Sequence, residues 1–157
     1  MNKMIWGNAF AYYHTFSILY KRLNNATKNA KQEEEKTLEQ ADLMLFFPAA
    51  TNLAFACELF LKSMLPNETH GHNLRELFGK LDNNLQNEIK QLTISIMQNR
   101  DKNKVYSETD FVNYISNNEM SFVEWRYFYE NKNSQTFDIE FMKCFCEVLL
   151  QFSKGTK

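Results

Sequence analysis

The sequence contains few of the residues that favour tight turns, with four glycines and two prolines among 157 residues. No stretch alternates apolar and polar residues with the two-residue period of a strand flanked by hairpin turns, which excludes a β-rich fold. A glycine-rich phosphate loop is also absent, which excludes the nucleotide-binding classes that depend on one. These absences together predict an all-α protein.

Cysteine is scarce, and the three present are an odd number: Cys57, Cys144 and Cys146. An odd count within apolar surroundings favours buried, reduced thiols and a cytoplasmic location. Cys144 and Cys146 are two residues apart, about 200° around a helix, so they point to opposite sides and a shared metal is not expected. The N-terminus lacks the apolar core and cleavage site of a signal peptide. We therefore expect neither metal nor cofactor.

Net charge is almost absent as well: the formal value is −1 at pH 7, which excludes a generally basic protein that coats nucleic acid. Long uninterrupted hydrophobic runs are missing too. The longest apolar region, 43–65, is broken by Pro48, Asn52, Glu58 and Lys62. Such polar interruptions indicate a buried helix of a soluble protein and no membrane span.

Helical periodicity is the pattern that dominates the chain. Apolar residues recur at steps of three and four over 5–23, which predicts a helix with a wide apolar face. The polar segment 24–36 is expected to be a solvated connection or a frayed helix end. A second helix is expected from Pro48 to Leu65, since proline suits a first helical position and Pro66 can end the helix. This helix is apolar nearly all round, which predicts a central position.

Capping residues suggest where three further helices begin. Asn73 is followed by Glu76 and Ser121 by Glu124, both at the three-residue spacing of a capping box, and Asp138 is expected to cap a last helix. Two more helical stretches are expected at 84–99 and 109–115. The prediction is one domain over 1–157, a bundle of about five to seven helices.

A single arginine stands in the aromatic segment 122–129 and raises the question of its partner. An arginine buried among aromatic rings needs an acceptor, because an unpaired buried charge is very costly. Glu58 is the only acid in the apolar stretch of the central helix, so we predict a contact between Glu58 and Arg126. Lys62 follows Glu58, and Glu130 follows Arg126, at the four-residue spacing of helical ion pairs. The pattern fits a structural ion pair as well as it fits a functional site.

Two histidines, His70 and His72, lie in the connection between two expected helices. No third ligand with motif spacing accompanies them, so a metal site is not expected. His72 directly precedes the expected cap Asn73, and we expect it to hydrogen-bond to backbone or to a neighbouring helix.

Three motifs in this order resemble the HEPN superfamily of small all-α domains, over about residues 52 to 130. They are an E-x-x-x-K helix (Glu58, Lys62), a G-H-x-L turn (Gly71, His72, Leu74) and a W-R-Y segment (Trp125, Arg126, Tyr127). The resemblance implies a HEPN-like helical fold and a homodimer. It also implies a role in nucleotide or RNA metabolism.

HEPN ribonucleases carry an R-x(4–6)-H motif, whose arginine stabilises the charge on phosphate and whose histidine moves a proton. Arg126 is followed at the matching offsets by Asn131, Lys132 and Asn133, so the strict motif is missing. We therefore assign no catalytic residue, and an enzyme is not the favoured hypothesis. One alternative is a divergent ribonuclease in which His72 acts together with Arg126.

The favoured hypothesis is a non-catalytic HEPN-like module. It binds a nucleotide, RNA or another anionic ligand, or pairs with a nucleotidyltransferase-type partner in a toxin–antitoxin-like or defence system. The expected ligand-binding residues are Glu58, Lys62, His72, Arg126 and Glu130. A second alternative is a scaffold that dimerises through its aromatic first or last helix.

Overall fold

The computed structural model describes residues 2–32, 44–126 and 137–155, and these residues contain helices and no strand. The all-α prediction is therefore confirmed for this part of the chain. The helices are α1 (Lys3–Gln32), α3 (Phe46–Met64), α4 (Leu74–Gly79), α5 (Asn83–Arg100), α6 (Glu108–Asn117), α7 (Ser121–Arg126) and α8 (Ile139–Gly155).

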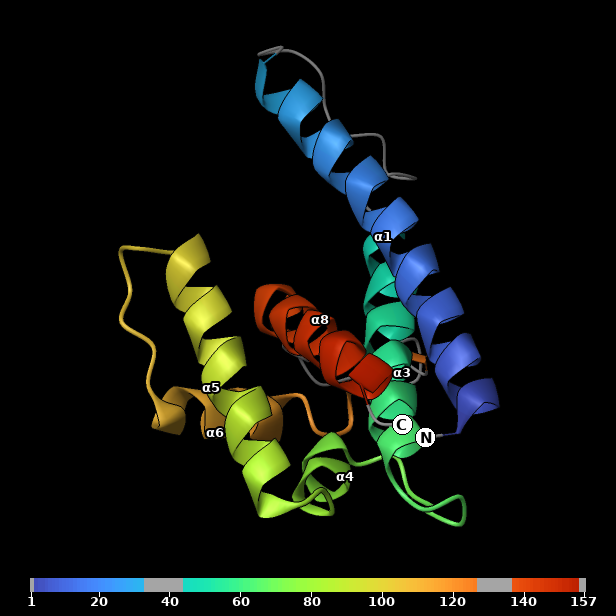
Figure 1. Cartoon of the computed structure of the whole chain (residues 1–157). Coiled ribbons are helices and arrows are strands. Elements are labelled where there is room, and N and C mark those ends of the chain that lie inside the picture. The colour runs from blue at the N-terminus through green and yellow to red at the C-terminus, as the bar shows by residue number, and fades with distance from the viewer. Residues whose placement is uncertain (1, 33–43, 127–136, 156–157) are drawn as a thin grey trace.

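Helix α3 is the centre of the molecule, as its all-round apolar sequence predicted. It runs beside α1 in the opposite direction, α8 crosses it on another side, and α5 lies beyond α8 (Figure 1). Helices α4 and α7 also pack on α3. The start of α1 meets the end of α3, where the Asn2 amide donates to the Ser63 carbonyl at 3.1 Å. The two ends of the chain lie close together, since the Trp6 indole donates to the Ser153 hydroxyl at 3.0 Å.

Small side chains explain why α3 can be approached from so many sides. Four fully buried alanines let neighbouring helices come close to its backbone: Ala49, Ala50, Ala54 and Ala56. Larger buried residues, Leu53, Phe60 and Leu61, fill the remaining space. Although α3 contains most of the longest apolar region, none of the described helices is long and apolar enough to cross a membrane.

A cluster of aromatic rings joins α8 to α6 and α4. Phe145 is fully buried and lies within 6 Å, centre to centre, of three other rings: Phe78, Phe111 and Phe141. Most of these rings meet edge to face, which aromatic pairs prefer, while Phe141 and Phe145 stack one turn apart along α8. This cluster fixes the position of α6 on the far side of α8 from α1.

Two of the three predicted caps are confirmed. The Asn73 side chain accepts from the Glu76 amide at 2.9 Å, and Asp138 accepts from the Phe141 amide at 2.8 Å. The capping box predicted at Ser121 is wrong, because Ser121 is itself the first residue of α7 and its buried hydroxyl points toward Asn118. A complete capping box forms instead between Ser107 and Asp110 at the start of α6.

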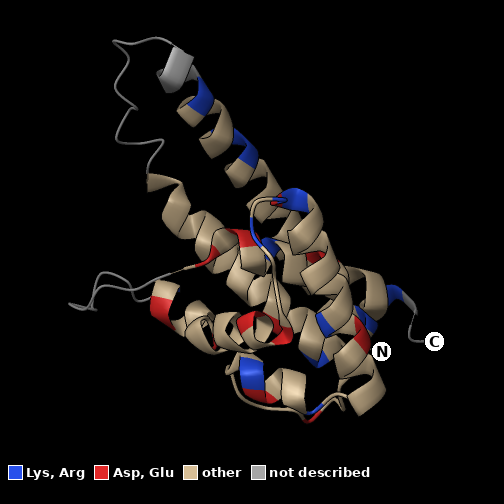
Figure 2. Cartoon of the chain, turned by 90° about the vertical axis from the view of Figure 1, so that its left-hand side faces the viewer, with Lys and Arg blue, Asp and Glu red and all other residues tan. Residues whose placement is uncertain are grey.

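Helix α1 is longer than predicted, since it continues through the polar segment to Gln32. No glycine or proline occurs between Gly7 and Pro48 to end it. Along its 30 residues α1 contains lysines and an arginine but no acidic residue. The C-terminal half of α1 therefore shows basic bands and no acidic band (Figure 2). Helix α3 begins two residues before Pro48, at Phe46.

The Phe145→Leu variant tests the aromatic cluster. We expect it to lower the free energy of unfolding by about 1–2 kcal/mol, because leucine keeps the apolar character but loses part of the ring contacts. Urea unfolding followed by circular dichroism measures this loss. Val112→Ala, at a position that is 46% exposed on α6, is the control and should change stability by about 0.5 kcal/mol or less. Equal losses in the two variants would contradict the assigned core.

Candidate functional site

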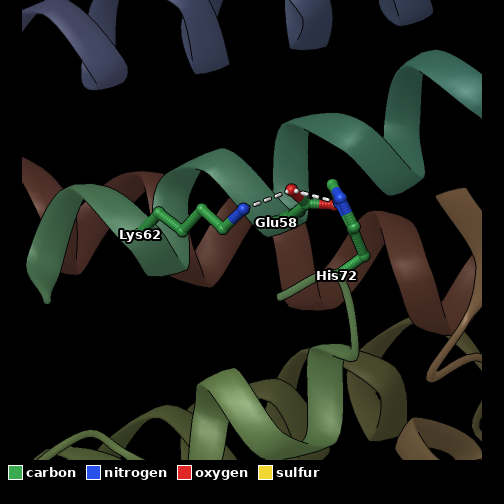
Figure 3. Close-up of polar contacts among 3 residues, drawn as sticks. All are labelled: Glu58, Lys62 and His72. Carbon is green, nitrogen blue, oxygen red and sulfur yellow. Dashed lines mark hydrogen bonds and ion pairs between the residues drawn. The ribbon is translucent and has the colours of Figure 1, made fainter. Parts of the chain in front are cut away.

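The candidate site is built around Glu58, which lies on the central helix with only 1% of its side chain exposed. Its carboxylate has two partners (Figure 3). Lys62, one turn later on α3, donates from Nζ to Oε1 at 2.8 Å. His72, from the loop between α3 and α4, places Nδ1 at 3.0 Å from Oε1 and 3.1 Å from Oε2. A carboxylate can be held in a helical core when charge and hydrogen bonds compensate it in this way.

The residues on either side of His72 determine the path of its loop. Gly71 has a φ of +106°, a conformation that residues with a side chain rarely adopt. Asn73 caps α4, and the next amide, that of Leu74, donates to the Glu119 carbonyl at 2.8 Å. The glycine and the asparagine of the G-H-N-L sequence therefore place His72 against α3.

Glu58 determines which ring nitrogen of His72 carries the proton. A carboxylate only accepts hydrogen bonds, so the Nδ1 atom that faces both oxygens is the protonated one. Nε2 makes no hydrogen bond within the described part of the chain, and the His72 side chain is 53% exposed. The arrangement leaves an oriented imidazole whose Nε2 lone pair can accept a proton, or whose protonated form can donate to an anion.

Arg126 does not contact Glu58, so the predicted pairing of these two residues is wrong. The partners of Glu58 are Lys62 and His72. Arg126 is exposed at the end of α7, with its guanidinium carbon 5.0 Å from the centre of the Phe122 ring one turn earlier. The inward face of α7 is formed by Ser121, Phe122 and Trp125. The arginine thus lays its stem along the helix and keeps its charge in water.

The Phe122 ring is a shared neighbour of His72 and Arg126. One face of the ring stacks on Phe55 of α3, with centres 4.1 Å apart and planes at 14°. The His72 ring lies 5.9 Å from the same centre. The structure thus brings together four of the expected site residues, Glu58, Lys62 and His72 directly and Arg126 through Phe122. The fifth, Glu130, lies outside the described residues.

Phe55 and Phe122 are the site residues that sequence reasoning missed. Both belong to apolar stripes that looked like ordinary core. The four-residue spacing from Phe122 to Arg126, which places a cation next to an aromatic ring on a helix, was the signal that could have identified Phe122.

The charges around the site favour a negatively charged ligand. Lys62 already compensates Glu58, so His72 and Arg126 are the exposed polar groups of the cluster. On α7, burial and repulsion from Glu119 raise the pKa of Glu124.

The cysteines form no reactive site. All three are buried free thiols, as expected. Cys144 faces α5, where Arg100 donates to its sulfur at 3.2 Å, whereas Cys146 faces the other way, toward Cys57 of α3. Burial raises the pKa of Cys144 to about 11, and it also raises that of Cys146. These thiols are therefore protonated at neutral pH and are poor nucleophiles.

Comparison with known proteins identifies no relative: no family model matches the sequence, and no curated protein or solved structure matches it either. The resemblance to HEPN domains thus stays a prediction from the three motifs. In the described part of the chain, no three His, Cys, Asp or Glu side chains come together as a metal site would need.

The contact between Glu58 and His72 predicts the tautomer of His72. Neutral His72 should carry its proton on Nδ1, although Nε2 is the usual position, and Glu58→Gln should weaken that preference. Long-range proton–nitrogen correlation spectra of the imidazole rings measure this directly. His70, which is exposed and has no side-chain hydrogen bond in the described structure, is the internal control. A wild-type His72 protonated on Nε2 would contradict the assigned contact.

Proposed function

We propose that the chain is a non-catalytic, HEPN-like module that binds a nucleotide or a related organic anion. In this proposal Arg126 and the imidazolium form of His72, which donates from Nε2, contact the anionic group. Glu58 and Lys62 position His72 from α3 and do not contact the ligand. Arginine suits such a role because its planar guanidinium can donate two parallel hydrogen bonds to phosphate or carboxylate.

One observation carries the proposal. His72 precedes α4 and Arg126 ends α7, so they are far apart in the sequence, but both lie against the ring of Phe122. A guanidinium that lies flat over an aromatic face keeps its N–H groups in its own plane, directed away from the ring, where they remain able to donate. The His72 side chain is 53% exposed, and its Nε2 makes no hydrogen bond within the described part of the chain. A phosphate group that contacts both residues would gain charge and direction together.

Homodimer formation, a nucleotidyltransferase-type partner and a cytoplasmic location belong to the same proposal. They rest on the resemblance to HEPN domains and not on the geometry of the site. Measuring the molecular mass in solution tests the dimer separately from ligand binding.

A second candidate function, general acid–base catalysis on RNA, is favoured by the contact between Glu58 and His72. A carboxylate that accepts from Nδ1 fixes the imidazole tautomer and stabilises the imidazolium that forms when Nε2 takes a proton. His72 would then supply the proton transfer that the missing R-x(4–6)-H histidine performs in HEPN ribonucleases. Arg126 would stabilise the charge that develops on the phosphate.

Ligand binding is tested with the four nucleoside 5′-monophosphates as probes in calorimetric titrations. We expect at least one of them to bind, and Arg126→Ala to weaken that binding by about tenfold or more. The reason is that a charge-assisted hydrogen bond contributes about 1.5–3 kcal/mol, and 1.4 kcal/mol corresponds to a factor of ten.

The matched control is Lys102→Ala, which removes one positive charge from an exposed position after α5 and should leave the affinity unchanged. An equal loss in both variants would indicate general electrostatic attraction. Unaltered binding by Arg126→Ala would remove Arg126 from the site. If none of the four nucleotides binds, the proposal is contradicted.

The catalytic candidate makes a different prediction for the same proteins. Purified chain should cleave a single-stranded RNA, and His72→Ala should reduce the rate by about a hundredfold or more, which is the usual contribution of a positioned acid or base. His70→Ala is the control, because it removes a histidine from the same loop outside the cluster. If the chain binds a nucleotide but does not cleave the RNA, the result would support the binding module over the catalytic candidate.

A further inference from the structure

A groove adjoins the candidate site on the side of Arg126. It lies between the first turns of α3 and the end of α7 and has a volume of about 690 Å³. Its lining residues are Met44, Phe47, Pro48, Thr51, Asn52, Trp125 and Arg126. This volume is within the range of about 300–1,000 Å³ that is typical of small-molecule pockets.

The walls of the groove offer apolar contact and little hydrogen bonding. Thr51 donates from its hydroxyl to the Phe47 carbonyl at 3.0 Å, and Asn52 donates to the Pro48 carbonyl at 2.6 Å. Thr51 thus uses its one donor on its own helix, and Asn52 uses one of its two amide N–H donors there. Arg126 is the only charged side chain that lines the groove in the described structure. The groove therefore fits an apolar group that carries one negative charge at the Arg126 end.

Aromatic rings form one wall. Trp125 packs against Phe46, Phe47 and Phe137, with ring centres 5.4 to 6.1 Å apart, so the indole is held rigidly at the groove. Rings of this kind contact other rings face to face in an offset manner or edge to face. A flat aromatic group is for this reason a better occupant than a sugar or a flexible polar chain.

Arg126 takes part in both the candidate site and the groove. Its guanidinium lies over Phe122, the ring that His72 also adjoins, and its side chain also lines the groove. An anionic group between Arg126 and His72 would consequently leave the rest of the ligand pointing along the groove.

We propose that this groove binds the aromatic body of the ligand whose anionic group contacts Arg126 and His72. The inference rests on the proposed function and adds selectivity to it: the site should prefer aromatic phosphates over phosphates of the same charge without an apolar body. Phenyl phosphate and methyl phosphate are the probes, because they share the phosphate group and differ in the body alone.

Trp125 serves as the reporter. The chain has two tryptophans, so Trp6→Phe leaves the fluorescence of Trp125 as the only indole signal. We expect phenyl phosphate to change this fluorescence and to bind about tenfold or more tightly than methyl phosphate. Calorimetry on the unaltered chain repeats the comparison, so that an unstable Trp6→Phe protein does not remove the test.

Thr51→Phe is the variant that fills the groove while it keeps Arg126 and His72. It should abolish the preference for phenyl phosphate and leave the affinity for methyl phosphate unchanged. Val112→Phe, which adds the same ring at an exposed position of α6, is the matched control and should retain the preference.

The outcomes separate the two proposals. If both phosphates bind equally and depend on Arg126, the anion site stands and the groove inference is overturned. If phenyl phosphate keeps its preference in Thr51→Phe, the groove is not where the ring binds, and the inference is overturned as well. If phenyl phosphate binds in a groove-dependent manner that Arg126→Ala and His72→Ala leave unaltered, the anion site fails. If neither phosphate binds, the proposed anion site fails and the groove inference falls with it.

Discussion

The burial of one carboxylate on the central helix is the constraint on which the candidate site depends. Glu58 lies in a helix that is packed from several sides, where an uncompensated charge would cost several kcal/mol. Lys62 supplies the opposite charge from the same helix, and His72 supplies a hydrogen bond from outside it. Since His72 must come from the loop, the loop has to pass close to α3, and Gly71 and Asn73 provide the turn and the cap that this path needs.

The same constraint separates the supporting residues from the exposed ones. Glu58 and Lys62 satisfy each other, and together they orient His72, whose outer nitrogen remains available. Arg126 is exposed and adjoins this group at the Phe122 ring, and Glu58 is compensated by Lys62 and His72 without it. An exposed cation that shares an aromatic neighbour with an oriented imidazole is a more suitable contact for a ligand than a buried ion pair would be.

A second polar cluster, on α5 and α8, gives a useful contrast. Arg100 donates to Glu147 at 2.6 Å and to the sulfur of Cys144, so its hydrogen bonds join two helices. The protonated state of Cys144 and the paired state of Arg100 fit a structural role. Arginine next to a thiol is thus insufficient evidence of a reactive centre, because burial outweighs the effect of the positive charge on the pKa of the thiol.

The sequence by itself determined the helices, the central place of α3, the caps at Asn73 and Asp138, and the pairing of Glu58 with Lys62. All of these depend on contacts within a few residues, which periodicity and spacing express directly. Only the tertiary structure decided that Glu58 meets His72, that Arg126 is exposed over Phe122, and that a groove lies beside it. These features depend on how helices distant in the sequence pack, and a buried acid accepts whichever donor the packing brings to it.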